Sequence, residues 1–455
     1  MKQNGGPNLR RADARRSMIH RQRWCRHMNT IWDREKLSVG FVSTRLAGTD
    51  GVSLETGKLN DILTQAGHKT FYCAGELDPD GPPGSLIPEL HFEYPEVRAL
   101  HDAAFRGVSL PNLRQRIDTL ARQQVRSLLR FVDDCAIDLL IPQNVLAIPM
   151  NVSLGLALAE LIKATGIPTL AHHHDFAWER ERFRDSPIED LIRAAFPPDD
   201  PSICHAVIST LARRELQTRC GIDSVVLPNV MDFESPPPAR EDRCAELRAR
   251  LGFDASDIVV LQPTRVVPRK GIEYSIDLIA GLAERLAPRT IRLLISHCAG
   301  DEGPEYLAWL ETRARQARVS LTLAADLLVD QRQDGGSADR FDLRDAYEMS
   351  DFVAYPSLIE GFGNAFLEAV FYRRPLMVNR YPVYVSDIRP CGFDVIEIDQ
   401  RVDDHTIRHV ADVLETPSRY ERMVSRNFEL GRQSFSYETA RTRLDEAFRR
   451  FDESA

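Results

Sequence analysis

The sequence predicts an α/β protein built from two domains of similar size, each with a parallel sheet. Short β-branched runs alternate with helix-length amphipathic stretches, a pattern that favours parallel strands covered by helices on both faces. Three consecutive prolines in a charged segment, from Met231 to Arg243, interrupt this alternation near the middle of the 455 residues. Such a composition is typical of a linker between domains.

The expected elements follow the same alternation in both halves. The expected strands are 37–43, 69–74, 138–143, 168–174, 205–210 and 224–229, then 257–264, 291–296, 351–357 and 375–379. The expected helices include 55–66, 153–165, 271–285 and 304–317. Near the C-terminus, Ser436 is a candidate helix cap. An apolar stripe at helical spacing follows it and needs a burial site: Ala440, Leu444, Ala447, Phe448 and Phe451.

Composition excludes several classes of protein. A net charge of −9 argues against a broad nucleic-acid surface. No apolar run approaches the length of a membrane-spanning helix, and the N-terminus lacks the apolar core of a secretory signal. The 8 cysteines are scattered singly without a C-x-x-C spacing, so we interpret them as reduced thiols of a cytoplasmic protein.

Residues 1–36 form a basic segment. They contain ten Lys or Arg residues and three Asp or Glu residues. We interpret the segment as a disordered tail, or as the product of a start codon placed too early, with Met28 as the true start. A patch that contacts anionic lipid or a partner is the alternative.

Residues that follow strands are the candidates for function, because open parallel sheets bind ligands at the carboxyl ends of their strands. Glu360 follows the strand at 351–357, and a glycine-containing turn then leads into a helix. Free N–H groups at a helix start bind phosphate, and carboxylates accept hydrogen bonds from sugar hydroxyls. An ordinary acidic helix start is the alternative. The candidates in this segment are Glu360, Gly361, Phe362, Gly363, Asn364 and Glu368.

A second candidate loop follows the strand at 257–264. Arg265 and Lys270 lie between this strand and the next helix. Two cations at a strand end suit a diphosphate leaving group, although two solvated loop cations are an equally simple interpretation.

Together these motifs, R-x4-K-G at 265–271 and P-S-x-x-E-G-F-G-x4-E at 356–368, resemble the retaining glycosyltransferases of family four. The resemblance covers about 37–451 and implies the GT-B fold. In that fold two Rossmann-like domains face each other across a cleft, and the final helix crosses back onto the first domain. We therefore expect an N-terminal domain at 37–232 completed by 436–455, a linker at 233–244 and a C-terminal domain at 245–435.

The resemblance also implies roles for single residues. Arg265 and Lys270 hold the donor diphosphate, Glu360 contacts the transferred sugar, and Glu368 contacts the ribose. In the first domain Gly51 matches the glycine whose amide approaches the leaving phosphate, although Asp50 beside it repels an anion. The family places a histidine at the end of strand 168–174, and the sequence leaves His173 and His174 as candidates.

Further segments of the first half resemble enzymes that build small glycerate-based compatible solutes. They are PQNVLAIPMNVSLG and HHHDFAWERERF. A tryptophan stacks on sugar rings and an arginine binds a carboxylate, whereas a surface helix of mixed charge is the plainer interpretation. The acceptor-site candidates are Asn144, Asn151, Asp175, Trp178 and Arg180.

The function expected from these observations is retaining transfer of a hexose from a nucleotide-diphosphate sugar, GDP-mannose or UDP-glucose, to a small carboxylated, polyhydroxylated acceptor such as glucosylglycerate. No cofactor or metal is expected, because the sequence lacks a dinucleotide-binding motif and a P-loop, and Asp78-Pro79-Asp80 lies in turn-forming sequence. One alternative is a lipid-directed enzyme that uses a basic amphipathic helix at 113–130. The other is an inactive sugar-nucleotide-binding protein.

Overall fold

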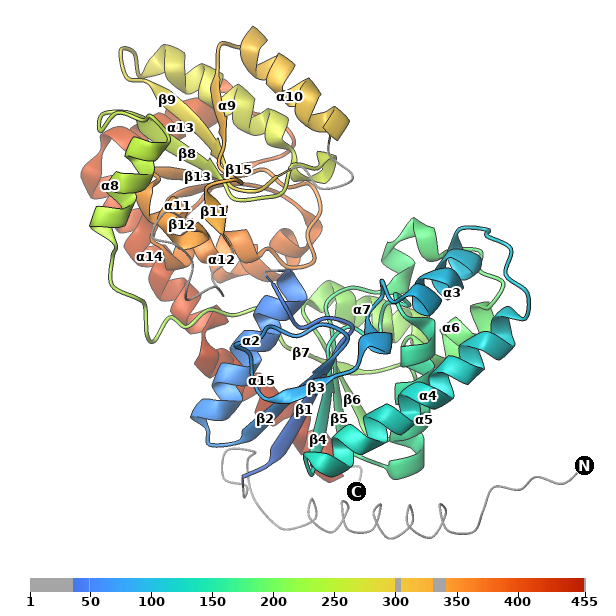
Figure 1. Cartoon of the computed structure of the whole chain (residues 1–455). Coiled ribbons are helices and arrows are strands. Elements are labelled where there is room, and N and C mark those ends of the chain that lie inside the picture. Colours follow the sequence, from blue (N-terminus) through green and yellow to red (C-terminus); the bar gives the residue numbers. More distant parts are fainter. Residues whose placement is uncertain (1–35, 49, 299–303, 330–340, 454–455) are drawn as a thin grey trace, which may run out of the picture. The chain divides into compact units, whose positions relative to one another are not determined.

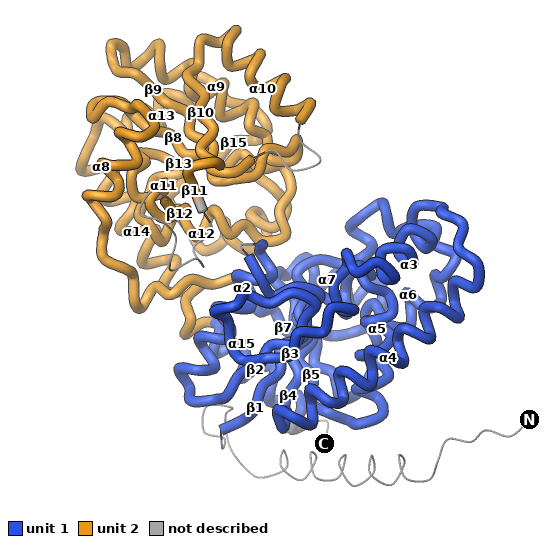
Figure 2. Tube along the Cα trace, in the orientation of Figure 1, with its two compact units in different colours: residues 1–228, 440–455 blue, residues 229–439 orange. Residues whose placement is uncertain are grey.

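The computed structural model describes residues 36–453 except 49, 299–303 and 330–340, so the basic tail lies outside the described residues. The chain divides into two compact units (Figure 2). Unit 1 comprises residues 1–228 and 440–455, and unit 2 comprises residues 229–439. Unit 1 is therefore assembled from two separate stretches of sequence.

Unit 1 is built on a seven-stranded sheet in the order β3-β2-β1-β4-β5-β6-β7, and each pair of neighbours is parallel. Sequence analysis missed the short edge strand β3 in unit 1, and in unit 2 it missed the strands at 320–323, 328–329, 341–342 and 396–398. The strands of unit 1 are β1 Ser38–Val42, β2 Lys69–Ala74, β3 Gly84–Leu86, β4 Leu139–Pro142, β5 Thr169–His173, β6 Ile203–Val207 and β7 Ser224–Val226.

Helices pack on this sheet (Figure 1). They are α2 Gly51–Gln65, α3 Pro95–Phe105, α4 Leu113–Asp134, α5 Val152–Thr165, α6 Glu189–Ala195 and α7 Thr210–Cys220. In one core cluster of the unit, Leu140 of β4 and Leu158 of α5 are almost fully buried. The sheet is therefore covered as the alternating pattern predicts.

Helix α4 is the basic amphipathic helix on which the lipid-directed alternative rests. Its apolar face is buried in unit 1, because Ile117, Leu120 and Leu128 are each at most 5% exposed. Three of its arginines, Arg114, Arg116 and Arg122, are paired with acidic groups, such as Arg114 with Asp190 at 2.6 Å. The apolar face of α4 is therefore used in folding.

No helix in the described part of the chain is long and apolar enough to cross a membrane.

Unit 2 is built on a six-stranded sheet in the order β10-β9-β8-β13-β14-β15, again with parallel neighbours. Its strands are β8 Ile258–Gln262, β9 Ile291–Ile295, β10 Ser320–Leu323, β13 Phe352–Tyr355, β14 Leu376–Asn379 and β15 Ile396–Ile398. A separate two-stranded sheet pairs β11 Leu328–Val329 with β12 Phe341–Asp342. The helices are α8 Glu241–Arg250, α9 Ile272–Arg285, α10 Pro304–Gln316, α11 Leu343–Met349, α12 Asn364–Phe371, α13 Asp404–Glu415 and α14 Pro417–Phe435.

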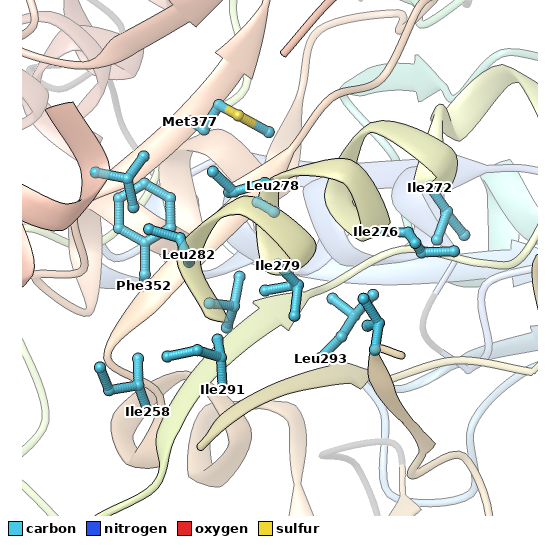
Figure 3. Close-up of a cluster of buried hydrophobic side chains, with 14 of the residues drawn as sticks. Ile258, Ile272, Ile276, Leu278, Ile279, Leu282, Ile291, Leu293, Phe352 and Met377 are labelled. Carbon is cyan, nitrogen blue, oxygen red and sulfur yellow. The ribbon is translucent and has the colours of Figure 1, made fainter. Parts of the chain in front are cut away.

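One hydrophobic core cluster of unit 2 forms between α9 and the sheet (Figure 3). Ile276, Ile279 and Leu282 occur at helical spacing, so one side of α9 presents them together. They belong to one buried cluster with Leu293 of β9 and Phe352 of β13. This packing holds the start of α9, and with it the loop after β8, against the sheet.

Each sheet reverses its strand order once. In unit 1 the reversal lies between the neighbours β1 and β4, and in unit 2 it lies between β8 and β13. The loops that leave two such strands run to opposite sides, which opens a crevice at the carboxyl ends of the strands.

The expected linker at 233–244 lies within unit 2. Residues 241–244 form the first turn of α8. Phe233 is buried against the rings of Phe371 and Phe428, both in unit 2. Its hydrophobic side chain therefore ties the start of this segment to unit 2.

The C-terminal helix α15, Tyr437–Glu453, contains the predicted apolar stripe. The Ser436 hydroxyl accepts a hydrogen bond from the N–H of Thr439, as expected of a cap. The stripe residues Ala440, Leu444, Ala447 and Phe448 are buried. Arg441 bonds to Gln65 of α2, so the helix rests on unit 1.

We predict that Leu282→Ala lowers the free energy of unfolding by about 2–5 kcal/mol, because it removes a fully buried side chain from a packed core. Urea unfolding followed by circular dichroism measures the change. Glu284→Ala, at an exposed position on the same helix, serves as the control. Equal effects of the two substitutions would contradict the packing in Figure 3.

Candidate active site

The two loops at the strand reversal of unit 2 meet in a buried ion pair. Lys270 Nζ lies 2.5 Å from Glu360 Oε1, and each side chain is 10% exposed. Leu358 N donates to the carbonyl oxygen of Arg269 at 2.8 Å, which joins the loop backbones. At Gly271, whose φ is +60°, a Cβ would lie 2.5 Å from the Pro356 oxygen. The glycine in the R-x4-K-G motif thus permits the loops to approach.

Both partners of the ion pair have lowered pKa values, for different reasons. Burial raises the pKa of Glu360, but the charge of Lys270, its hydrogen bond and the neighbouring hydroxyl groups of Ser357 and Tyr355 outweigh it and hold the pKa below its usual value. Burial lowers the pKa of Lys270 and outweighs the charge of Glu360, while Arg269 and Arg265 lower it further. The loop therefore carries more positive charge than Glu360 compensates.

Arg265 and Arg269 supply this excess charge. Arg269 Nη1 lies 3.6 Å from Glu360 Oε2 and donates to the carbonyl oxygen of Ile359 at 3.2 Å. Arg265 is exposed and forms no ion pair within the described part of the chain. The described site thus presents a cation whose charge is available to an anionic ligand.

A buried tyrosine supports the turn after Glu360. Tyr381 donates to the carbonyl oxygen of Phe362 at 2.8 Å. Gly363, the cap of α12, has φ +124°, and a Cβ there would lie 2.2 Å from the Tyr381 hydroxyl. Gly361 is exposed, and Asn364 Oδ1 accepts from Asn229 at 2.5 Å. The start of α12 is therefore rigidly placed beside Glu360.

Glu368 is positioned by a residue that sequence analysis missed. Tyr347 of α11 is fully buried and donates to Glu368 Oε2 at 2.8 Å. Burial, and then the Glu368 carboxylate, raise the pKa of Tyr347 far above its usual value, so the hydroxyl keeps its proton. Only the fold brings α11 to α12, and no spacing in the sequence indicates this contact.

At the start of α2 in unit 1, Asp50 caps the helix. Its Oδ1 accepts from Val52 N at 3.1 Å and from Ser53 N at 3.2 Å. The carboxylate thus occupies amides of the helix start that an anion would otherwise use. Gly51 is the first residue of the helix, and its amide is not among the groups that Asp50 caps.

The three histidines at the end of β5 point to opposite faces, as strand alternation predicts. His172 Nδ1 and His174 Nε2 lie 3.1 and 3.0 Å from Gln143 Oε1. On the other face, His173 Nε2 lies 2.8 Å from His205 Nδ1 of β6. Burial lowers the pKa of His174 to about 4, so its ring is neutral near pH 7. No group of three or more metal-ligating side chains occurs in the described residues.

Two of the acceptor-site candidates hold the fold together. Asn151 caps α5 by accepting from Leu154 N at 3.1 Å, and its amide donates to the carbonyl oxygen of Leu90. Asn144, at φ +63°, accepts from the N–H of His174 at 3.0 Å. Both side chains therefore fix the loops at the ends of β4 and β5.

The remaining candidates interact with one another or with the core. Arg180 Nε donates to Asp175 Oδ2 at 2.8 Å. The Trp178 ring stacks on Phe176 at 4.3 Å and 9°. One ring face of Trp178 is thus covered, and the guanidinium of Arg180 is already paired.

A pocket lies at the strand reversal of unit 1, between the ends of β1 and β4. It contains residues that sequence analysis did not select, although Ser43, Thr44 and Arg45 directly follow β1 and Gln143 directly follows β4, so the rule of strand ends would have found them. The pocket is lined by Ser43, Thr44, Arg45, Asp50, Val52, Phe92, Gln143, Asn144, Val145, Ile148, Met150 and Asn151.

We predict that Lys270→Met reverses the pH dependence contributed by Glu360. In the parent protein the lowered pKa adds stability above the unfolded pKa, and this is lost as pH falls through the folded pKa. Without Lys270, burial raises the Glu360 pKa above its unfolded value, so the carboxylate costs stability at neutral pH. Breaking a buried pair costs about 3–5 kcal/mol.

Urea midpoints at pH 7 and pH 4.5 measure this effect. The variant should recover stability on acidification relative to the parent, and the double variant Lys270→Met with Glu360→Gln should lose the reversal. Identical pH slopes in the parent and Lys270→Met would contradict the described pair.

Comparisons with known proteins identify relatives of this chain by sequence and proteins of similar fold by structure. The family of glycosyl transferases group 1 matches residues 245–429. The mannosylglucosylglycerate synthase of Thermotoga maritima is 33% identical over 433 residues, covering 88% of this chain and 97% of that protein. The synthase of the same name from Petrotoga mobilis is 30% identical over 432 residues, covering 88% and 98%.

Among solved structures, Anabaena HepE in complex with UDP and glucose matches with a TM-score of 0.61 at 15% identity, over 90% of this chain and 98% of that chain. Sucrose-phosphate synthase from Thermosynechococcus elongatus matches with a TM-score of 0.62 at 15% identity, over 92% and 100%. At such identity the likeness concerns the fold, and it confirms the predicted GT-B fold with its two Rossmann-like domains.

The family resemblance is therefore confirmed along nearly the whole length of the relatives. The chain belongs to the group 1 family of glycosyltransferases, as a hexosyltransferase related to the mannosylglucosylglycerate synthases.

Proposed function

We propose that the protein transfers a hexose, with retention of anomeric configuration, from a nucleotide-diphosphate sugar to glucosylglycerate or a close relative. The observation that carries the proposal is the buried Lys270–Glu360 pair, which joins the loop after β13 to a loop after β8 that has excess positive charge. A diphosphate leaving group supplies the negative charge that this loop lacks, and a carboxylate beside it accepts hydrogen bonds from the sugar hydroxyls.

In this proposal unit 2 holds the donor. Arg265 and Lys270 bind the diphosphate and stabilise its charge as the anomeric C–O bond breaks. Glu360 binds the hexose, and Glu368, fixed by Tyr347, accepts from the ribose hydroxyls. HepE, which shares the fold, binds UDP-glucose, and UDP-glucose and GDP-mannose are the donors we favour.

Unit 1 holds the acceptor in this proposal. The relationship to mannosylglucosylglycerate synthases supports an acceptor that carries a glycerate group. Of the two histidine candidates, we assign His174 to the reacting centre, because it contacts Gln143, which lines the pocket at the strand reversal. His173 faces His205 instead. Because Nε2 of the neutral His174 ring donates to Gln143 Oε1, its Nδ1 carries no proton and can accept one hydrogen bond from a sugar hydroxyl.

We predict that Arg265→Ala and Lys270→Ala each lower turnover by about 10²-fold or more, the scale for one lost preorganised contact to a developing charge. Release of nucleoside diphosphate over a panel of donors with glucosylglycerate measures the rate. Arg432→Ala, which removes an exposed arginine paired with Glu429 on α14, is the control. Turnover close to the parent value in both site variants would remove the donor-site assignment.

We further predict that transfer persists in EDTA, because the cations of the loop after β8 take the place that a divalent ion has at other diphosphate sites. Initial rates are compared after dialysis against EDTA and after adding back Mg²⁺ or Mn²⁺. Complete loss in EDTA with recovery on adding either ion would show that a metal takes part.

A further inference from the structure

The pocket of unit 1 contains a cation whose hydrogen-bonding groups are only partly satisfied by the described residues. Arg45 lies in the loop after β1, and its Nη2 donates to Asp50 Oδ2 at 3.1 Å. Its Nε is buried and has no hydrogen-bond partner in the described part of the chain. The guanidinium has five N–H groups, and its contact with Asp50 uses Nη2 alone.

The position of Arg45 is held by two neighbours that also line the pocket. The guanidinium lies 5.7 Å from the ring centroid of Phe92, within range of a cation–π contact. Asp50 is fixed by the two backbone amides that it caps. A guanidinium placed in this way loses little freedom when it binds a planar anion.

The opposite wall of the pocket is polar and leads to the histidines. Gln143 is fully buried and lines the pocket, while its Oε1 contacts both His172 and His174. Its Nε2 has no hydrogen-bond partner among the described residues. A buried amide without a partner is rare in native proteins, and a bound ligand oxygen is one way to satisfy it.

We propose that this pocket binds the acceptor and that Arg45 recognises its carboxylate, with Asp50 and Gln143 bonding to its hydroxyl groups. The inference rests on the proposed function and names the residue that selects a carboxylated acceptor. Arg45 meets a planar carboxylate with two N–H donors. Asp50 balances its charge when the pocket holds no anion, and it disfavours a dianion such as a phosphate monoester.

Two other assignments compete with this one. Arg180 was the cation expected from the sequence, but it is paired with Asp175, and neither residue lines the pocket. A donor phosphate at the start of α2 is the second, but Asp50 already occupies the amides of Val52 and Ser53 there. The experiment described next distinguishes both assignments from the proposal.

The experiment compares glucosylglycerate with glucosylglycerol, in which a hydroxymethyl group replaces the carboxylate. The ratio of the two kcat/KM values is measured by product chromatography for the parent protein, Arg45→Gln and Arg45→Lys. We expect the parent to prefer the carboxylate and Arg45→Gln to lower the ratio about 10- to 150-fold, the scale of a charge-assisted contact. Arg45→Lys should recover part of the ratio because it keeps the charge.

Controls separate the competing assignments. Arg122→Gln removes an exposed arginine paired with Asp118 on α4, and it should keep the parent ratio. An unchanged ratio in Arg45→Gln, or its loss in Arg180→Gln instead, would overturn the inference and leave the proposed function standing. A rise in donor KM that is equal with both acceptors would assign Arg45 to the donor. If the parent transfers to neither acceptor, the proposed function fails, and the inference fails with it.

Discussion

The reversal of strand order in each parallel sheet is the constraint on which both candidate sites depend. Because neighbouring strands at the reversal send their loops to opposite sides, their carboxyl ends stay uncovered by crossover helices. In unit 2 the loops after β8 and β13 meet there and form the Lys270–Glu360 pair. In unit 1 the loops after β1 and β4 line the pocket that contains Arg45 and Gln143.

The two sites differ in the balance of their positive and negative side chains. In unit 2 the cations of one loop exceed the carboxylate of the other, and burial makes the uncompensated charge costly. In unit 1 Arg45 faces its own counter-ion, Asp50, so the pocket is nearly balanced. The first arrangement suits a strongly anionic leaving group, and the second suits a ligand that combines one negative charge with hydroxyl groups.

The sequence predicted the architecture because buried parallel strands and amphipathic helices leave strong periodic patterns. The edge strand β3 escaped detection since it has only three residues, Gly84–Leu86, in a proline-rich turn. Roles on the acceptor side were harder to predict, because they depend on contacts between distant segments. Trp178 has the chemistry to stack on a sugar, but Phe176 covers one face of its ring. Asp50 was expected to repel a phosphate, and the fold uses it as a helix cap.

The split composition of unit 1 also bears on synthesis at the ribosome. Residues 37–228 contain the whole seven-stranded sheet, but the helix that contains the buried residues Ala440, Leu444 and Phe448 is translated only after unit 2. Until then the nascent sheet lacks part of its apolar cover, while all of unit 2 is still being made. Premature termination before residue 440 therefore yields a chain with an exposed hydrophobic surface, the kind of species that chaperones bind and proteases remove.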